Sequence, residues 1–244
     1  VAILRAAPEQ TEETALMRRL VGEAAVALQP DEVLIADRGF GVALVQQQGV
    51  RRFVVRLQRN AVAYRRQPPA YSGCGRKPTR GALVRLLART HKGNPLPATP
   101  PDAVVRWQEP HKAGQLLLEA HCWDDLCVKG APVDAAPVRM VALFDPRYKE
   151  PLLLATDLPE CVTPRALRDL YLERWPVEMV PQTAKQMLGA HRQFVFGAEA
   201  RWRLPELSLV TACVALYLAA LHAPLATGFW DRRPRATPGR WRRW

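Results

Sequence analysis

The sequence lacks the features that define several common protein classes. Its five cysteines, at positions 74, 122, 127, 161 and 213, form no Cys-x-x-Cys pair, so a zinc site with paired ligands is not predicted. This odd, irregular set, with no signal peptide, favours a reducing cytoplasm over a disulfide-bonded secreted protein. The glycine-containing stretch 73–78 has no Gly-Lys-Ser/Thr ending, so it is not a phosphate-binding loop of the Walker type.

Acidic residues are few compared with basic residues. The chain has 23 Asp and Glu against 35 Lys and Arg, which gives a net charge of +12. Such an excess favours nucleic acid or another anionic surface as the partner, and the guanidinium forks of Arg suit phosphate oxygens. Hydrophobic residues make up 48% of the 244 residues. This is enough for a core in one or two domains.

The sequence also has no uncharged apolar run of the roughly 20 residues that a membrane span requires. The longest candidate lies within residues 205–221, which we predict to be a helix. Because its uncharged part is short, we expect a buried core helix and no membrane partner. The basic stretch 227–244 has no periodicity and is expected to be a disordered tail.

The first sixty residues predict alternating helices and strands. Residues 9–29 and 41–48 have helical patterns, and residues 33–37 and 51–57 resemble buried strands. Strand, helix and strand at this spacing favour a parallel βαβ unit. Asp37 then lies at the carboxyl end of a strand, where open α/β sheets place their sites. An Asp at this position also commonly begins a turn or caps a helix.

The middle of the chain is basic and then rich in strand patterns. Residues 58–102 are expected to be irregular, either a basic loop that follows a DNA backbone or a solvated loop. Residues 103–156 contain four predicted strands, with Asp124 and Asp125 in a turn between two of them. These strands are 104–107, 115–121, 138–144 and 151–155.

The stretch from Tyr171 to Lys185 carries polar residues at a helical spacing. On one continuous helix, Tyr171, Arg174, Glu178 and Lys185 would project within roughly 60° of one another. One carboxylate, two cations and a phenol suit a metal ion and phosphates. An amphipathic helix with Arg174 and Glu178 as i,i+4 partners explains the same pattern without a site.

Two prolines interrupt this helical pattern. Pro176 and Pro181 each remove a backbone donor, at a cost of about 3 kcal/mol in a helix interior. Pro176 would be tolerated if a fresh helical segment began beside it. Pro181 has no such explanation on a continuous helix.

Together these stretches resemble a group of bacterial insertion-sequence transposases. The spacing Tyr-x2-Arg-x3-Glu-x6-Lys from Tyr171 to Lys185 resembles the signature of these DDE recombinases. Asp37-Arg-Gly-Phe40 is similar to the family's strand that carries its second catalytic Asp, and Phe53-Val-Val-Arg56 is similar to the strand that follows. The resemblance runs from about residue 10 to about residue 222.

The resemblance implies an α/β fold with a ribonuclease H-like core and an inserted, mostly-β subdomain. It divides the chain into a partial core, 1–57, a basic loop with a β-rich insertion, 58–156, and the C-terminal core helices, 157–226, before the tail. Only 36 residues precede Asp37, so we expect the first core strands, and the first catalytic Asp that they carry in the family, to be missing.

The resemblance also implies roles for five residues. Asp37 and Glu178 would be catalytic and would hold Mg²⁺ or Mn²⁺, and Tyr171, Arg174 and Lys185 would bind DNA. The family cuts transposon ends and joins them to target DNA, so the expected partners are both DNAs and a second subunit in a homodimeric synaptic complex. The expected location is the bacterial cytoplasm, at the nucleoid.

Without a third carboxylate, this chain is expected neither to cleave nor to join DNA. Its function would then be that of an inactive transposase fragment. One alternative is a non-catalytic basic DNA-binding protein derived from a transposase. Another is an unrelated basic α/β protein whose motifs arose by chance.

Overall fold

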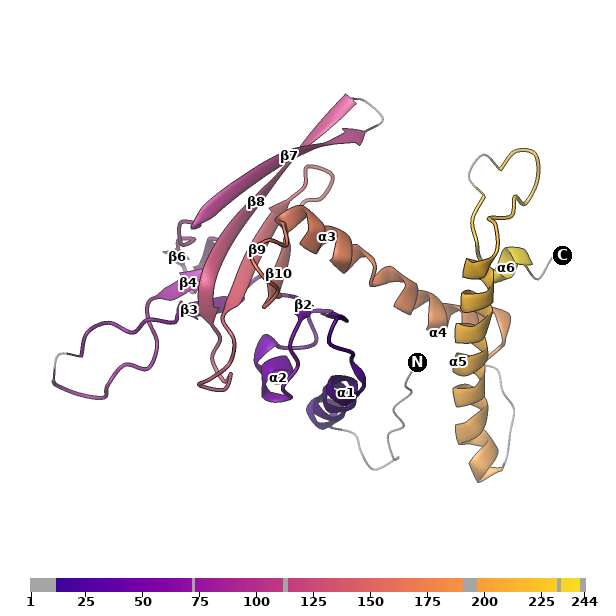
Figure 1. Ribbon diagram of the computed structural model, residues 1–244, viewed down its shortest axis with the longest axis horizontal. Coiled ribbons are helices and arrows are strands. Elements are labelled where there is room, and N and C mark those ends of the chain that lie inside the picture. The colour runs from indigo at the N-terminus through magenta and orange to yellow at the C-terminus, as the bar shows by residue number, and fades with distance from the viewer. Residues whose placement is uncertain (1–11, 72, 112–113, 191–196, 232–233, 242–244) are drawn as a thin grey trace. The chain divides into compact units, whose positions relative to one another are not determined.

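The structure, a computed structural model, describes residues 12–71, 73–111, 114–190, 197–231 and 234–241 (Figure 1). The chain divides into two compact units after Leu172. We call the part before this boundary the sheet unit and the part after it the helical unit. The described chain is a mixed α/β protein, in which helices accompany a mostly antiparallel sheet.

The sheet unit begins with the predicted βαβ arrangement. Helix α1 (Glu13–Ala27) precedes strand β1 (Leu34–Ala36), helix α2 (Val42–Gln47) and strand β2 (Phe53–Arg56). The two strands pair in parallel, with Leu34 opposite Phe53 and Ala36 opposite Val55. The short apolar runs therefore predicted these strands, their direction and the helix between them correctly.

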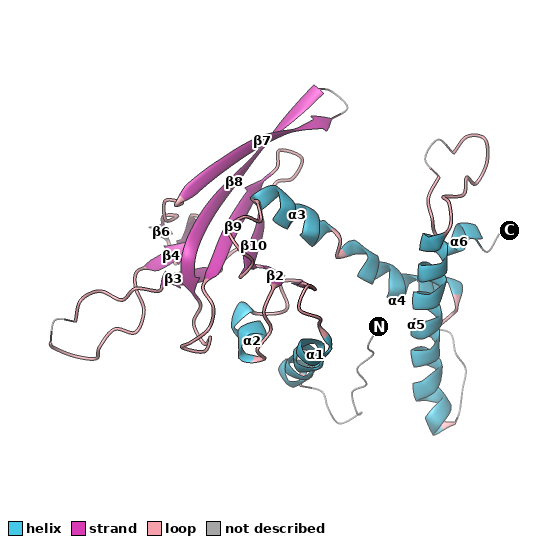
Figure 2. Cartoon of the chain, in the orientation of Figure 1, coloured by secondary structure: helices cyan, strands magenta, loops and turns pink. Residues whose placement is uncertain are grey.

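The other strands of the sheet unit extend the same sheet. The main sheet has the order β1-β2-β10-β9-β8-β3-β4, with β7 paired to β8, and it includes the four strands predicted within residues 103–156 (Figure 2). The segment 58–102, expected to be irregular, contains four short strands. The bounds are β3 (Val62–Arg65), β4 (Leu83–Arg85), β5 (Arg89–His91), β6 (Asn94–Leu96), β7 (Ala103–His111), β8 (Gly114–Cys127), β9 (Val138–Phe144) and β10 (Leu152–Thr156).

The turn expected at Asp124 and Asp125 is wrong. Both residues lie inside β8, at a shift in register between Trp123 and Leu126. Asp125 has φ of +49°, a left-handed conformation that Asp tolerates better than most residues. Asp124 donates its backbone N–H to Asp102 and accepts from Arg139 with its side chain. These bonds hold a β-bulge where the composition suggested a chain reversal.

Alternating residues of the strands build a core on each face of the sheet. Phe53 and Val55 join α1 and α2 on one face, whereas Val54 joins Leu167 on the other face. Leu167 belongs to helix α3 (Pro164–Leu172), the last element of the sheet unit. The period of two along a strand thus produces three layers, with α1 and α2 on one side and α3 on the other.

The helical unit contains α4 (Trp175–Met187), α5 (Ala198–Leu221) and α6 (Pro238–Trp241). Helix α5 is longer than expected and is not the expected buried core helix, since only 17% of its most apolar window is buried. By length and composition, α5 is the one helix in the described chain that could cross a membrane. Of the α5 residues whose burial the structure describes, Ser208, Ala212 and Ala219 are buried.

The described part of the expected tail is structured. Leu225 forms a β-bridge with Arg235, and α6 follows within the same segment. Arg240 pairs with Asp231 at 2.6 Å and donates to the carbonyl of Leu225 at 2.7 Å. The basic composition suggested a solvated tail, but these partners anchor it locally.

Candidate nucleic-acid interface

Asp37 lies where β1 ends, at the carboxyl edge of the parallel pair. Its carbonyl accepts the N–H of Phe40 at 2.9 Å, and its Oδ1 accepts the N–H of Arg38 at 2.8 Å. Asp37 therefore begins a turn, as short polar residues commonly do. Its carboxylate also remains 39% exposed, so the turn leaves it accessible at this edge of the sheet.

The sheet unit brings Asp37 together with Tyr171, 134 positions further along the chain. The Tyr171 hydroxyl donates a hydrogen bond to Oδ1 of Asp37 at 3.3 Å. The pleat explains the direction of the carboxylate, because Ile35 and Asp37 share a face of the strand and Ile35 packs in the α3 layer. The first residue of the four-residue motif thus meets the Asp of the other motif.

Helix α3 is held on the sheet by apolar packing and by charge. Leu167 is fully buried and Tyr171 is 5% exposed. Arg168 lies 2.9 Å from Glu109 of β7 and 3.7 Å from Asp145, which follows β9. Since these three side chains are at most 15% exposed, their pairing is screened less by solvent than a surface pair would be. The network fixes the helix that carries Tyr171.

Asp145 itself is held in its charged form. Arg147 donates hydrogen bonds to both of its carboxylate oxygens, from Nε to Oδ1 at 2.8 Å and from Nη2 to Oδ2 at 2.6 Å. These hydrogen bonds, opposed by burial and aided by the nearby charge of Arg168, hold the pKa of Asp145 below its ordinary value. Protonation of Asp145 in acid should therefore weaken the ion pairs that hold α3 on the sheet.

Several arginines lie at the same edge of the sheet as Asp37, and Arg56 is in contact with it. Arg56 ends β2, next to Asp37 in the parallel register, and its Nη1 lies 3.7 Å from Oδ1 of Asp37. A cavity of about 490 Å³ is lined by Arg38, Arg59 and Arg89. A smaller cavity of about 40 Å³ shares Arg38 and Arg59 and adds Arg56. We call the surface formed by Arg38, Arg56, Arg59 and Arg89 the arginine groove.

The arginine groove is only partly neutralised by protein carboxylates. Arg59 pairs with Glu150 at 3.0 Å, and both side chains are about 70% exposed. The Arg38 guanidinium has no ion-pair partner within the described sequence. The Nε–H of Arg89 is buried and donates to no acceptor that the structure describes. A buried donor without a partner is costly, so the groove suits an added acceptor such as a phosphate oxygen.

The structure places the other predicted site residues in the helical unit. Arg174 precedes α4 and its Nη2 lies 2.9 Å from Oε1 of Glu178, the i,i+4 contact expected for a helix. Glu178 is 47% exposed at its side chain, and Lys185 is exposed in the last turn of α4.

The expected single helix from Tyr171 to Lys185 is wrong. Helix α3 ends at Leu172, residues 173 and 174 form a turn, and α4 begins at Trp175. Pro176 lies in the first turn of α4, where its missing N–H is not needed. The angle of roughly 60° assumed one unbroken axis, so it does not describe these four side chains. Pro181 lies inside α4.

Other acidic residues, after β10 and before β7, serve local structure. Asp157 accepts the backbone N–H groups of Arg52 and Phe53 at 3.0 and 2.8 Å. Asp102 receives two hydrogen bonds from Arg65, which lower the pKa of its carboxyl. Among the residues that the structure describes, no three His, Cys, Asp or Glu side chains gather as metal ligands.

A scan against protein-family models finds no match to this chain, and a search of curated proteins finds none either.

Proposed function

We propose that the chain binds DNA through the arginine groove and is part of a DDE transposase with a ribonuclease H-like core. The observation that carries this proposal is the groove itself, beside an Asp that is hydrogen-bonded to Tyr171. Asp37 and Tyr171 belong to different motifs far apart in the sequence, and their hydrogen bond within the sheet unit supports a common site.

The chemistry of the groove favours phosphate. The groove has four guanidiniums, of which Arg56 pairs with Asp37 and Arg59 with Glu150, so the groove keeps a positive balance. Arg forms paired hydrogen bonds with phosphate oxygens, and contacts of this kind position a nucleic acid without reading its sequence. We infer that the groove follows a sugar-phosphate backbone and supplies affinity more than sequence specificity.

The proposal does not include a metal-dependent step. In the family that the motifs resemble, Asp37 and Glu178 would hold Mg²⁺, which prefers six oxygen ligands, most often from one or two carboxylates, phosphates and water. Oδ1 of Asp37 already accepts hydrogen bonds from Arg38 and Tyr171. The described residues offer no cluster of three ligands, so they do not fit a complete catalytic metal site. We therefore propose association with DNA without cleavage.

Salt-dependent binding tests this proposal. Fluorescence anisotropy with a labelled duplex would give the affinity of the wild type, of Arg38→Ala and of Arg89→Ala over a series of salt concentrations. Each groove variant should weaken binding and lower the salt slope by about one for each phosphate that it no longer neutralises.

Arg18→Ala is the matched control, because Arg18 is exposed on α1 and lines neither groove cavity. Equal losses for Arg18→Ala and the groove variants would mean that only net charge matters. That result would contradict the proposed interface.

A further inference from the structure

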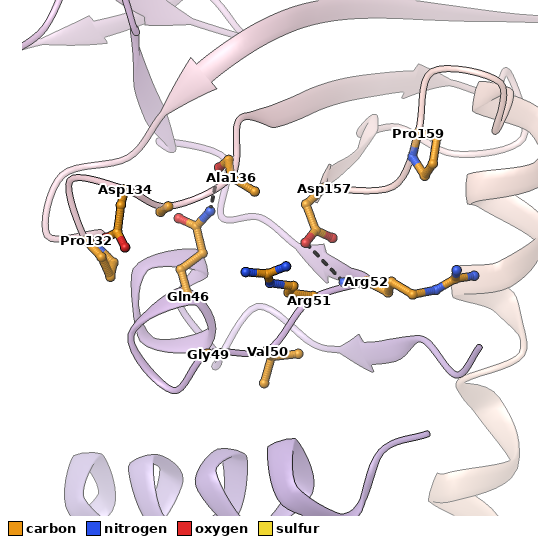
Figure 3. A pocket seen from close by; sticks show the side chains of 11 residues that line it. Gln46, Gly49, Val50, Arg51, Arg52, Pro132, Asp134, Ala136, Asp157 and Pro159 are labelled. Carbon is orange, nitrogen blue, oxygen red and sulfur yellow. Dashed lines mark hydrogen bonds between the residues drawn. The ribbon is translucent and has the colours of Figure 1, made fainter. Parts of the chain in front are cut away.

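A second cavity lies at the opposite edge of the sheet from Asp37. Asp37 follows the carboxyl end of β1, whereas this cavity is lined by the loop that leads into the amino end of β2 (Figure 3). Its volume is about 520 Å³, within the range of small-molecule sites. We call it the Gln46 pocket. Its polar lining consists of Gln46, Arg51, Arg52, Asp134 and Asp157.

Gln46 presents a buried acceptor that has no donor. The side chain is on α2, and the residue is 9% exposed. Its Nε2 donates to the carbonyl of Ala136 at 2.9 Å, which fixes the orientation of the amide because the reverse orientation would oppose two oxygens. Its Oε1 is buried and accepts no hydrogen bond from the residues described. Buried polar atoms normally have partners, so this oxygen indicates a missing donor.

Two arginines line the same pocket, and in Figure 3 the side chain of Arg51 points toward Gln46 whereas that of Arg52 points away from it. Arg51 and Arg52 are exposed, and neither guanidinium has a hydrogen-bond or ion-pair partner in the described chain. In the view of Figure 3, the Arg51 side chain lies between Gln46 and Asp157. An anionic group that enters the pocket would find unpaired guanidinium donors there.

The backbone of this loop is held in a conformation that few residues adopt. Arg52 has φ of +65°, which is uncommon for a residue other than Gly. The carboxylate of Asp157 holds the loop by accepting the N–H groups of Arg52 and Phe53. Strained backbone of this kind is concentrated at ligand sites. Asp157 therefore fixes the loop, while Asp134 adds an exposed acceptor to the lining.

We propose that the Gln46 pocket binds a nucleotide. The phosphate would pair with Arg51, and a sugar hydroxyl or base amino group would donate to Oε1 of Gln46 or to Asp134. A simple anion satisfies only the guanidinium of Arg51, whereas a nucleotide carries both the anion and the donors. The nucleotide is either free or part of a DNA strand, and both sources share this chemistry. The inference is independent of DNA binding at the arginine groove.

Isothermal titration calorimetry with deoxynucleoside 5′-monophosphates, with inorganic phosphate and with a short single-stranded oligonucleotide tests the proposal. A monophosphate should bind in a 1:1 complex and more tightly than inorganic phosphate. Arg51→Ala should weaken nucleotide binding about tenfold, since a charge-assisted hydrogen bond is removed. Arg18→Ala, which removes the same charge from α1, should leave the affinity unchanged.

Gln46→Met separates the acceptor from the cations. It should weaken nucleotide binding while the weak binding of inorganic phosphate stays the same. Cooperative thermal unfolding of Gln46→Met would show that this buried substitution leaves the protein folded. Arg51→Ala tests the same pocket at an exposed position, where the substitution does not change the core. If the oligonucleotide competes with the nucleotide for the wild type but not for Arg51→Ala, the pocket binds a DNA strand. If the oligonucleotide does not compete, the pocket binds free nucleotides. The proposal would be overturned if no nucleotide binds, if inorganic phosphate binds as tightly as the nucleotide, or if Arg18→Ala loses as much affinity as Arg51→Ala.

Discussion

The hydroxyl of Tyr171 donates to Oδ1 of Asp37 at 3.3 Å, and this hydrogen bond connects the end of β1 with α3 across 134 positions of sequence. Tyr171 is 5% exposed, and its ring packs with the core that contains Val54 and Leu167. Core packing therefore aims the hydroxyl, and the turn after β1 aims the carboxylate. The direction of the hydroxyl therefore depends on residues that are distant in sequence, whereas that of the carboxylate depends on the local turn.

Tyr171→Phe should remove this hydrogen bond and keep the packing of the ring. We expect the free energy of unfolding to fall by about 0.5–1.5 kcal/mol, the usual net contribution of one hydrogen bond. Urea denaturation measures the change. Tyr148→Phe is the control, because Tyr148 is 68% exposed and should show no loss. A neutral result for Tyr171→Phe would mean that the hydroxyl is equally well solvated without Asp37.

Asp37→Asn should tighten DNA binding when no divalent metal is present. The Asp37 carboxylate is the acidic partner of Arg56 in the arginine groove, so its charge repels phosphates and partly neutralises that cation. Removing the charge should raise the affinity about twofold to fivefold, as expected for a partly solvated charge. Anisotropy in the presence of a chelator is the measurement, with the exposed Asp31→Asn as control. Weaker binding would show that Asp37 contributes to affinity directly.

Local patterns were sufficient for the first elements of the sheet unit. The apolar runs of β1 and β2, with a short helix between them, predicted a parallel pair with Asp37 at its carboxyl edge, and the structure confirms this arrangement. These predictions succeed because periodicity and strand length are properties of contiguous residues. The strands predicted within residues 103–156 were confirmed for the same reason.

The predictions failed where distant partners decide the structure. Asp124 and Asp125 are typical turn residues, but bonds to Asp102 and Arg139 hold them inside β8. The arginine groove is a similar case, because Arg38, Arg59 and Arg89 come from three separate segments that converge only in the folded chain. In the sequence, Arg89 is only one of many basic residues in the segment 58–102. The sequence did give a signal for Arg59. This residue follows β2, and β2 pairs in parallel with β1, which Asp37 follows.

Acid should loosen the attachment of α3 through Asp145. The pKa of Asp145 is lower in the folded protein than its ordinary value, mainly because Arg147 donates hydrogen bonds to the carboxylate. A lowered pKa contributes stability that is present above the unfolded pKa, near 3.9, and is lost as the pH falls through the folded pKa. The free energy of unfolding should therefore fall as the pH decreases below about 4.

Asp145→Asn isolates this contribution. The variant should be less stable than the wild type at neutral pH by about 1–3 kcal/mol, because the arginines lose a charged partner in a mostly buried place. The difference should shrink in acid, where the wild-type carboxyl is also neutral. Urea denaturation at several pH values measures both effects, and Asp31→Asn should show neither. A difference that does not change with pH would assign the loss to packing.

The chain should not nick DNA in the presence of Mg²⁺ or Mn²⁺. Family-type chemistry uses three carboxylates, and only Asp37 and Glu178 are candidates. Incubation with supercoiled plasmid, followed by electrophoresis, should show no metal-dependent conversion to the nicked form, and Glu178→Gln should behave like the wild type. Nicking that Glu178→Gln and Asp37→Asn both abolish would instead establish a catalytic site that these two residues share.

Replacing Pro181 should stabilise α4. Pro181 lies inside this helix, where its ring removes the hydrogen bond to the carbonyl four residues earlier and crowds that turn, at a cost of up to about 3 kcal/mol. Pro181→Ala restores the donor with the residue that favours helix most. Far-ultraviolet circular dichroism should show more helix, and the helical unit should unfold at higher urea. Gln182→Ala, at the adjacent exposed position, should change both quantities little. Unchanged helix content and unchanged resistance to urea in Pro181→Ala would mean that Pro181 does not destabilise α4.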